Sequence, residues 1–267
     1  MLRSMYAGIS GMKGFQTKLD VVGNNISNVN TAGFKKGRVT FQDLLSQTTT
    51  GASGPTENRG GVNPSQVGLG SQLGSIDDIH TQGFSQTTDN PLDLQLEGDG
   101  MFVLETPDGQ AYTRAGNFYL DTNGDIVNSD GYYLMGVDEN GQESHLNIPE
   151  NATNINIEKD GTVTYVDGDN NVEDNQQIQI AVFSNPAGLE KDGGSLYLES
   201  NNSGVPNLTD PETDGAATIV SGALEMSNVD LAEEFTEMIT AQRGFQANTR
   251  IITTSDEILQ ELVNLKR

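Results

Sequence analysis

The chain has 267 residues, of which 34% are apolar, with no Trp, no Cys and a net charge of −24 at neutral pH. The lack of Cys excludes disulfides, thiol catalysis and cysteine metal sites, and leaves only His80 and His145 as nitrogen ligands, which argues against zinc. The length predicts one or two domains, and the small apolar share predicts that part of the chain is extended or gains its burial from partners.

The charge is unevenly distributed along the chain. Residues 1–50 contain six basic and two acidic side chains, residues 228–267 contain four and seven, and the residues between them contain four and 29. We therefore exclude nucleic acid as a partner, because phosphate binding requires clustered Lys and Arg. No stretch approaches the ~20 apolar residues of a membrane span, and glycines and Lys13 interrupt the apolar run that a secretory signal needs, so we expect no membrane insertion and no cleaved signal peptide.

Residues 1–30 predict a long amphipathic helix. Its apolar residues recur at alternating steps of three and four, with Gln16 and Gly23 at the remaining positions, which is the heptad pattern of a coiled coil. This stripe, which we predict to be an assembly interface, consists of Leu2, Met5, Ile9, Met12, Leu19 and Ile26.

The same helix contains four glycines, each of which costs roughly 1 kcal/mol relative to Ala. An isolated helix of this kind should fray in water, so packing must supply the missing stability. A stripe of small residues beside the apolar one would let neighbouring helices approach closely: Ser4, Ala7, Gly8, Gly11 and Gly14.

The helix should end within residues 24–35, where the Asn residues and Gly33 favour termination and left-handed backbone conformations. The run GNNISNVNTAGFKK, residues 23–36, closely resembles the N-terminal signature of the bacterial flagellar axial proteins, the family that builds rod and hook. The resemblance assigns a family motif to Asn24, Asn25, Asn28, Thr31, Gly33 and Phe34.

Residues 34–90 predict an extended connector. Residues 38–45 are compatible with a strand, whereas residues 48–70 are rich in Gly, Ser, Thr and Pro. A loop of that length is typical of disorder or of an interaction segment. The family resemblance implies a connector between a coiled-coil layer and an outer domain.

Residues 91–221 predict an antiparallel β domain. From Leu92 the apolar period changes to two, and Pro107-Asp108-Gly109 is typical of a hairpin turn. The stretch EGDGMFVLETPDGQAYTRAGNFYLDTNGDIVNSDGYYLMG, residues 97–136, also resembles the family signature. Strands are predicted at residues 101–105, 111–114, 117–121, 132–136, 162–166 and 177–183.

No catalytic, cofactor or metal site is assigned in this domain. Residues 121–125 have the acidic spacing that opens a calcium loop, but Ile126 stands where Gly is needed and Tyr132 where Glu is needed, so we interpret them as a turn. Glu143 and His145 lack the helical spacing of a zinc protease pair. Ser195 follows two glycines without a nucleophile elbow or an obvious His partner.

Residues 222–267 predict a second long helix. Ser227 is the expected N-cap, with Asp230 favouring the N-terminus, and Lys266 and Arg267 place cations at the C-terminal end. The residues SNVDLAEEFTEMITAQRGFQANTRIITTSDEILQELVNLKR resemble the C-terminal signature of flagellar rod and hook proteins. The predicted apolar stripe contains Leu231, Phe235, Met238, Phe245, Ile252, Leu259 and Val263, with Gln242, Thr249 and Asp256 as polar interruptions.

The fold class we predict is α+β, with terminal helices that pair as a coiled coil around a central antiparallel β domain. The predicted parts are residues 1–33 and 222–267 for the helices, 34–90 for the connector and 91–221 for the β domain. The alternative for the helices is that each packs separately on a globular core.

The family resemblance implies a structural subunit that is not an enzyme and uses no cofactor. We take the short form of the flagellar hook as the main interpretation, a helical tube that transmits torque, because the tails resemble short Gram-positive hook proteins. The alternative is the distal rod of the basal body, which fits a chain with room for one β domain. The implied partners are copies of itself, neighbouring axial and junction proteins and the flagellar export apparatus.

Two rivals come from other classes of protein. A surface glycan hydrolase could use Asp121 and Asp125 as paired carboxylates, and hydrolysis by the purified monomer would support it. An adhesin would keep folded helices as a monomer.

Overall fold

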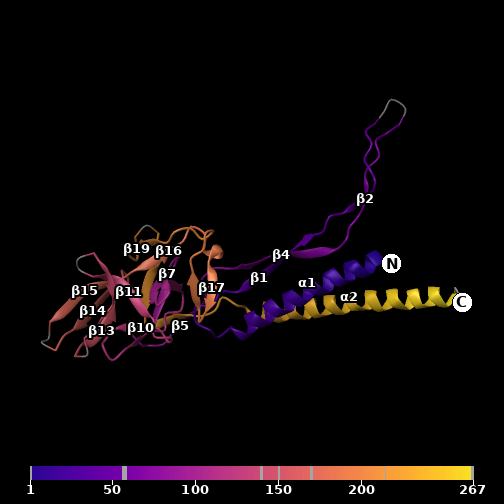
Figure 1. The fold of residues 1–267 in the computed structure, drawn as a ribbon. Coiled ribbons are helices and arrows are strands. Elements are labelled where there is room, and N and C mark those ends of the chain that lie inside the picture. The colour runs from indigo at the N-terminus through magenta and orange to yellow at the C-terminus, as the bar shows by residue number, and fades with distance from the viewer. Residues whose placement is uncertain are drawn as a thin grey trace. The chain divides into compact units, whose positions relative to one another are not determined.

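The protein divides into a helical unit and a β unit (Figure 1). The computed structural model describes residues 2–55, 59–138, 141–149, 151–168, 171–213 and 215–265. The helical unit comprises Met1–Ser27, Gly37–Asp78 and Asp230–Arg267, and the β unit comprises Asn28–Lys36 and Ile79–Val229. Both long helices belong to the first unit and the large antiparallel sheet to the second, which confirms the predicted α+β class.

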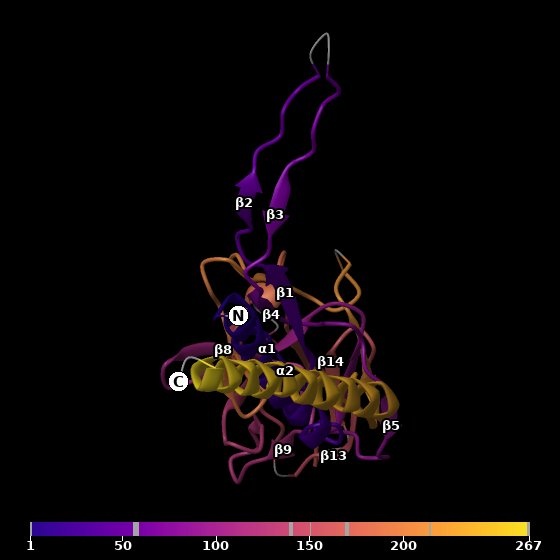
Figure 2. The same cartoon turned by 90° about the vertical axis from the view of Figure 1, so that its right-hand side faces the viewer.

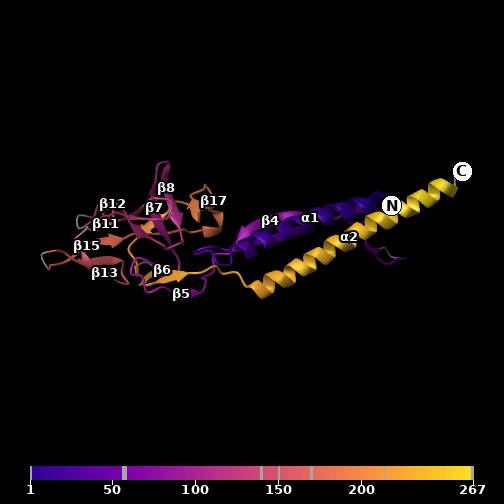
Figure 3. The same ribbon diagram turned by 90° about the horizontal axis from the view of Figure 1, so that it is seen from below.

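The helical unit is built on α1 (Leu2–Ser27) and α2 (Leu231–Leu265). The two helices lie side by side and run in opposite directions (Figures 1 and 3). All eight prolines of the sequence lie outside them, so no missing amide interrupts either helix. The predicted pairing of the terminal helices is confirmed.

The N-cap of α2 differs from the prediction. Asp230 caps the helix, because its Oδ1 accepts hydrogen bonds from the amides of Ala232 at 2.8 Å and Glu233 at 3.4 Å. The predicted cap, Ser227, instead accepts from the amide of Val229 at 3.3 Å, which keeps the chain non-helical for three more residues. The two predicted C-terminal cations, Lys266 and Arg267, lie outside the described residues.

The helical unit also contains a long two-stranded ribbon, within Gly37–Asp78 (Figure 2). β1 (Gly37–Asp43) pairs with β4 (Ser71–Asp78), with a bulge after Thr40. Beyond them β2 (Gln47–Thr50) pairs with β3 (Ser65–Val67). The strand expected at residues 38–45 is therefore present. The sequence does not reveal β2 and β3, because every side chain in them is exposed and no apolar alternation marks them.

The β unit is dominated by one large sheet in which every named strand pairing is antiparallel. The main path of the sheet is β13-β14-β15-β11-β7-β8-β18-β17, and shorter strands join it at β11 and β7. Its strands are β7 (Met101–Thr106), β8 (Gly109–Thr113), β9 (Tyr119–Leu120), β10 (Ile126–Val127), β11 (Tyr133–Asp138), β12 (Glu143–His145), β13 (Thr153–Ile157), β14 (Thr162–Val166), β15 (Val172–Ile178), β16 (Ile180–Val182), β17 (Glu190–Gly193), β18 (Leu196–Leu198) and β19 (Asn207–Thr209).

Two small antiparallel pairs and a short 3-10 helix complete the unit. β6 (Leu94–Glu97) pairs with β20 (Thr218–Ser221), and β5 (Ser85–Thr87) pairs with β21 (Ala223–Glu225). The 3-10 helix is Pro186–Gly188. Strands from the start and the end of the β unit are thus hydrogen-bonded to each other.

The core of the β unit consists of two apolar clusters on opposite sides of β7. Phe102 and Leu104 belong to the larger cluster, whereas Met101 and Val103 belong to the second. Successive strand residues point to opposite faces, so a strand buried on both faces is an uninterrupted apolar run. An edge-to-face aromatic pair lies in each cluster, Phe102 with Phe118 in the larger and Tyr112 with Phe183 in the second.

The predicted strands are confirmed where the apolar pattern is strong. The prediction at 162–166 coincides with β14, and those at 101–105, 111–114 and 132–136 overlap β7, β8 and β11. The predicted strand at 177–183 is interrupted at Gln179, because β15 pairs with β14 and β11 whereas β16 pairs with β7 and β19. The strands that the sequence does not reveal, such as the charged edge strand β17, lack alternation.

Candidate assembly interface

The contact between α1 and α2 places glycines of one helix against larger side chains of the other. A Cβ at Gly244 would lie 2.6 Å from Cζ of Phe15, and one at Gly11 would lie 2.7 Å from the side-chain nitrogen of Asn248. Gly8 faces Ile252 at ordinary van der Waals distance. Two of the four glycines that weaken α1 as an isolated helix, Gly8 and Gly11, are therefore residues that let α2 approach it.

The seam that joins the two helices is rotated from the predicted one. On α1 the residues that meet α2 fall mainly at positions 8, 11, 15, 18 and 25. The predicted stripe is displaced by one residue, which is a rotation of about 100° about the helix axis. Met12 is its one member with a described bond to α2, through the hydroxyl of Thr249. The side chain of Leu2 lies outside the described residues, and the displaced stripe otherwise comprises Met5, Ile9, Leu19 and Ile26.

On α2 one of the two predicted heptad series lies at the seam. The series Met238, Phe245, Ile252 and Leu259 is half-buried and includes the Gly8 contact. The second series consists of small or polar residues in place of the predicted apolar ones, because close approach leaves no room for large side chains. It contains Glu234, Ala241, Asn248 and Ser255, whereas the predicted Leu231, Phe235 and Val263 are exposed.

Large apolar side chains remain on the surface of both helices. Phe235 and Ile239 are half-exposed, and Val263 is 64% exposed. Exposed apolar stripes on a helix mark a surface that a partner covers. The set comprises Tyr6 and Ile9 on α1 and Leu231, Phe235, Ile239, Ile251, Ile258, Leu262, Val263 and Leu265 on α2.

A third helix face packs on the ribbon. A Cβ at Gly14 would lie 2.9 Å from the ring of Phe41 on β1, and one at Gly70 would lie 2.3 Å from the hydroxyl of Ser10. Phe41 and Phe15 form a tilted ring pair at 6.4 Å. α1 is thus held between α2 and the β1–β4 end of the ribbon, while strands β2 and β3 remain fully exposed.

Asn25 of the family motif anchors the end of α1. Its buried amide nitrogen donates to the Gly37 carbonyl at 2.9 Å and to the Glu234 carboxylate at 3.2 Å, and its Oδ1 accepts from the Gly37 amide at 3.0 Å. One side chain therefore sets the end of α1, the start of β1 and the first turn of α2. The neighbouring Asn24 is exposed.

The rest of the motif forms a tight turn in the β unit. Thr31 donates from its amide and hydroxyl to the carbonyl and side chain of Asn28. Gly33 adopts a left-handed φ of 70°, as predicted, and a Cβ there would lie 2.5 Å from the Ala115 backbone nitrogen. The Phe34 ring lies under the ammonium group of Lys191, at 5.2 Å.

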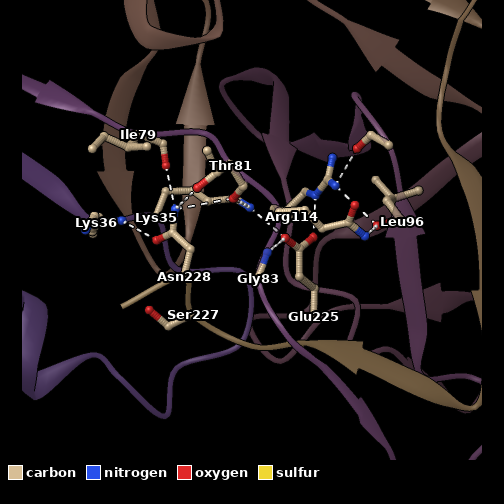
Figure 4. A network of polar contacts seen from close by, with 12 residues as sticks. Lys35, Lys36, Ile79, Thr81, Gly83, Leu96, Arg114, Glu225, Ser227 and Asn228 are labelled. Atoms are coloured by element: carbon tan, nitrogen blue, oxygen red, sulfur yellow. Dashed lines mark hydrogen bonds and ion pairs between the residues drawn. The ribbon is translucent and has the colours of Figure 1, made fainter. Parts of the chain in front are cut away.

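A buried ion network follows the motif (Figure 4). The Glu225 carboxylate accepts from Lys35 Nζ at 2.6 Å and from Arg114 Nε at 2.6 Å. It also accepts from the Gly83 amide at 2.8 Å. Glu225 is 1% exposed and Lys35 2% exposed, so both charges depend on these partners in place of water. The remaining Arg114 donors reach the carbonyls of Leu96, Gly98 and Gly100.

The network shifts the pKa of two of its members. Burial opposes ionisation of Glu225, but the charges of Arg114 and Lys35 together outweigh it and hold the pKa of that carboxyl below its ordinary value. Burial lowers the pKa of Lys35, although its attraction to Glu225 acts in the opposite direction. Two cations share one carboxylate, so removing Glu225 would leave both uncompensated.

The residues considered for catalysis or metal binding make contacts that support the fold. Asp121 and Asp125 close the predicted turn, with the Asp121 amide donating to the Asp125 carbonyl at 2.9 Å. His145 pairs with Glu105, and the Ser195 carbonyl accepts from Thr113. In the part of the chain that the structure describes, no three His, Asp or Glu side chains gather as a metal site, and no helix is long and apolar enough to cross a membrane.

Three family models match this sequence. One described as a flagella basal body rod protein matches residues 5–35, the D1 domain of flagellar hook protein FlgE/F/G matches residues 95–165, and the C-terminal region of flagellar basal body rod FlgEFG proteins matches residues 220–265. The flagellar basal-body rod protein FlgG of Bacillus subtilis is 56% identical over the whole of both chains.

The chain belongs to the flagellar rod and hook protein family.

Two further relatives, one a rod protein and one a hook protein, differ in length. The rod protein FlgG of Caulobacter vibrioides is 40% identical over 269 residues, covering 99% of this chain and 100% of the relative. The hook protein FlgE of Borreliella burgdorferi is 30% identical over 441 residues, with all of both chains aligned. Since this chain has 267 residues, the hook protein must contain long segments with no counterpart here.

Each charged member of the ion network lies in a different matched segment of this flagellar family. Lys35 belongs to the first, Arg114 to the second and Glu225 to the third. Sequence reasoning did not single out these three residues, nor Glu234 in the helix seam. The available signal was their position inside or beside the quoted family signatures, as with Lys35 directly after Gly33-Phe34.

Proposed function

We propose that this flagellar protein is a distal rod subunit of the basal body, which self-assembles into a helical tube through its terminal helices. The observation that carries the proposal is end-to-end alignment with rod relatives of nearly the same length, at up to 272 aligned residues among those compared, and with hook relatives only by way of long insertions. This favours the distal rod over the short hook.

The helical unit supplies the surface for assembly. Its two helices pack against each other along a seam of small residues. Large apolar side chains such as Phe235 and Ile239 remain exposed to solvent. A surface that meets a different patch on the next copy builds a helical filament when the contacts do not close into a ring. Copies of this chain are therefore the partners we assign to the exposed stripes.

Substitution of Phe235 by Asp tests the assembly surface. Because this ring is half-exposed in the single chain, Phe235→Asp should leave the circular dichroism spectrum of the monomer unchanged while abolishing filament formation in electron micrographs. Thr236→Asp, an exposed polar site one residue away, is the matched control and should still assemble. Normal filaments from Phe235→Asp would overturn the role of the stripe.

The position of the protein in the flagellum tests rod against hook. The chain contains no Cys, so Val205→Cys at a site 86% exposed provides a single attachment point for a gold label. Labelled particles should decorate a straight segment of the isolated flagellum. Labels along a curved segment would assign the protein to the hook.

A further inference from the structure

The chain passes between the two units at four places, after residues 27, 36, 78 and 229. Three of these crossings adjoin β-unit segments that are hydrogen-bonded to one another. We name the set of residues 33–36, 79–84 and 225–228 the collar. Every contact described below lies within the β unit.

Asn228 ties the three collar segments together with one side chain (Figure 4). Its Oδ1 accepts from the Lys36 amide at 2.8 Å. Its Nδ2 donates to the Ile79 carbonyl at 2.7 Å and to the Thr81 hydroxyl at 3.0 Å. The Ile79 amide in turn donates to the Lys36 carbonyl at 3.0 Å, so Lys36, Ile79 and Asn228 form a closed set of hydrogen bonds.

Glu225 repeats this arrangement three residues earlier. Its carboxylate binds Lys35 and the Gly83 amide, and its backbone carbonyl accepts from the Gly33 amide at 2.8 Å. The Met226 amide donates to the Phe84 carbonyl at 2.8 Å. Lys35 Nζ also donates to the Thr81 carbonyl at 2.8 Å, so each collar segment is bonded to both of the others at two levels.

Two of the collar segments are in close backbone contact. A Cβ at Gly83 would lie 1.8 Å from the Met226 carbonyl oxygen, a backbone atom that cannot move aside alone. The main chains of residues 83 and 226 are thus in direct contact, and opening one segment must displace the other.

We propose that the collar opens and closes as one cooperative body, so that force entering the β unit through any one of these three crossings is shared by all three segments. The inference rests on the proposed function, in which the subunit is part of a helical tube. Three segments hydrogen-bonded to one another must be displaced together, whereas three independent segments would be pulled away one at a time.

Hydrogen exchange on the purified monomer tests the cooperativity. Asn228→Asp keeps an oxygen facing the Lys36 amide but removes the donors to Ile79 and Thr81. A cooperative collar predicts that exchange rises by the same factor, about ten-fold for a lost buried hydrogen bond, at the amides of Lys36, Ile79, Gly83 and Met226. Asn228→Ala should give the same pattern with a larger factor.

Asn147→Ala is the matched control, because that side chain donates to the Asn123 carbonyl and to Asp125 elsewhere in the β unit. It should leave the collar amides at wild-type rates. Faster exchange confined to one segment in the Asn228 variants, or no change at all, would overturn the collar. Assembly of the same variants is scored separately: if the wild-type chain forms no filaments, the proposed function fails while the exchange result still decides the cooperativity.

Discussion

The β unit and the helical unit reach stability by different means. The β unit buries two continuous apolar clusters and pairs its buried charges internally. The helical unit buries few apolar side chains in its helices, Val22 and Ala241 among them, and leaves a larger set exposed. Burial of apolar surface is the dominant favourable contribution to folding, so the β unit is complete within one chain and the helical unit depends on further contacts.

The contrast explains the use of small residues at the helix seam. Glycine, Ala241 and Ser255 contribute little apolar area, so they make a close but weak contact between α1 and α2. The large side chains are on the faces that remain open. The chain thus combines a β unit stabilised by its own apolar core with a helix pair whose apolar faces remain open to solvent.

The largest expected effect is the destabilisation of the β unit by a change in its buried ion network. Glu225→Gln leaves the cations Lys35 and Arg114 without their shared carboxylate, and should lower the free energy of unfolding of this unit by about 3–5 kcal/mol. Urea unfolding followed by tyrosine fluorescence measures the change. Glu105→Gln, which removes an exposed partner of His145, should cost less than about 1 kcal/mol. Equal losses in both variants would contradict the importance of burial.

The stability difference between the wild type and Glu225→Gln should depend on pH. The folded state holds the pKa of Glu225 below 4.5, so its ionisation stabilises the fold fully above about that pH and the contribution is lost as the pH falls through the lower folded value. The difference in stability between wild type and Glu225→Gln should therefore narrow below pH 4.5. A constant difference down to pH 2 would disagree with this linkage.

A smaller effect tests the close approach of the helices. Gly244→Ala would drive a methyl group into the Phe15 ring, and should destabilise the helix pair by about 1–2 kcal/mol after allowing for the better helix propensity of Ala. Thermal melting followed at 222 nm measures it. A stabilised helix pair would show that the seam is looser than its geometry indicates.

The smallest expected effect separates contacts within one chain from those between chains. Gly23 has open space around its Cβ direction, so Gly23→Ala should stabilise α1 by about 1 kcal/mol and raise the helicity of the monomer. If a neighbouring copy needs that space, the same variant will assemble more slowly than wild type. Unchanged helicity in the dilute monomer would contradict the first expectation.

Sequence reasoning succeeds where apolar periodicity reports burial within one chain. The terminal helices, strand β14 and the two-faced run of β7 were predictable because their patterns match the geometry of helix and strand. The helix seam was predictable only in part, because one predicted apolar series, Met238, Phe245, Ile252 and Leu259, lies there. The other seam residues of α2 are small or polar, such as Ala241, Asn248 and Ser255, whereas the predicted Leu231, Phe235 and Val263 are exposed in the single chain.

The ion network and the ribbon were hidden for other reasons. Lys35 and Glu225 are 190 positions apart, and isolated charged residues are ordinarily exposed, so nothing local indicates that they meet in the interior. Strands β2 and β3 are exposed on both faces. Their pairing depends on the register set by β1 and β4 rather than on a pattern of their own.

The exposed ribbon also predicts that the association of copies depends on ionic strength. β2 and β3 contain no charged residue and present open strand edges, which ordinarily invite pairing with other chains. Each copy nevertheless has a charge of −24, and that repulsion extends roughly 30 Å at 0.01 M salt but only about 10 Å at 0.1 M. At low ionic strength, charge repulsion should therefore keep the subunits monomeric. Added salt should screen this repulsion and allow the ribbon and the helix surfaces to associate with other copies.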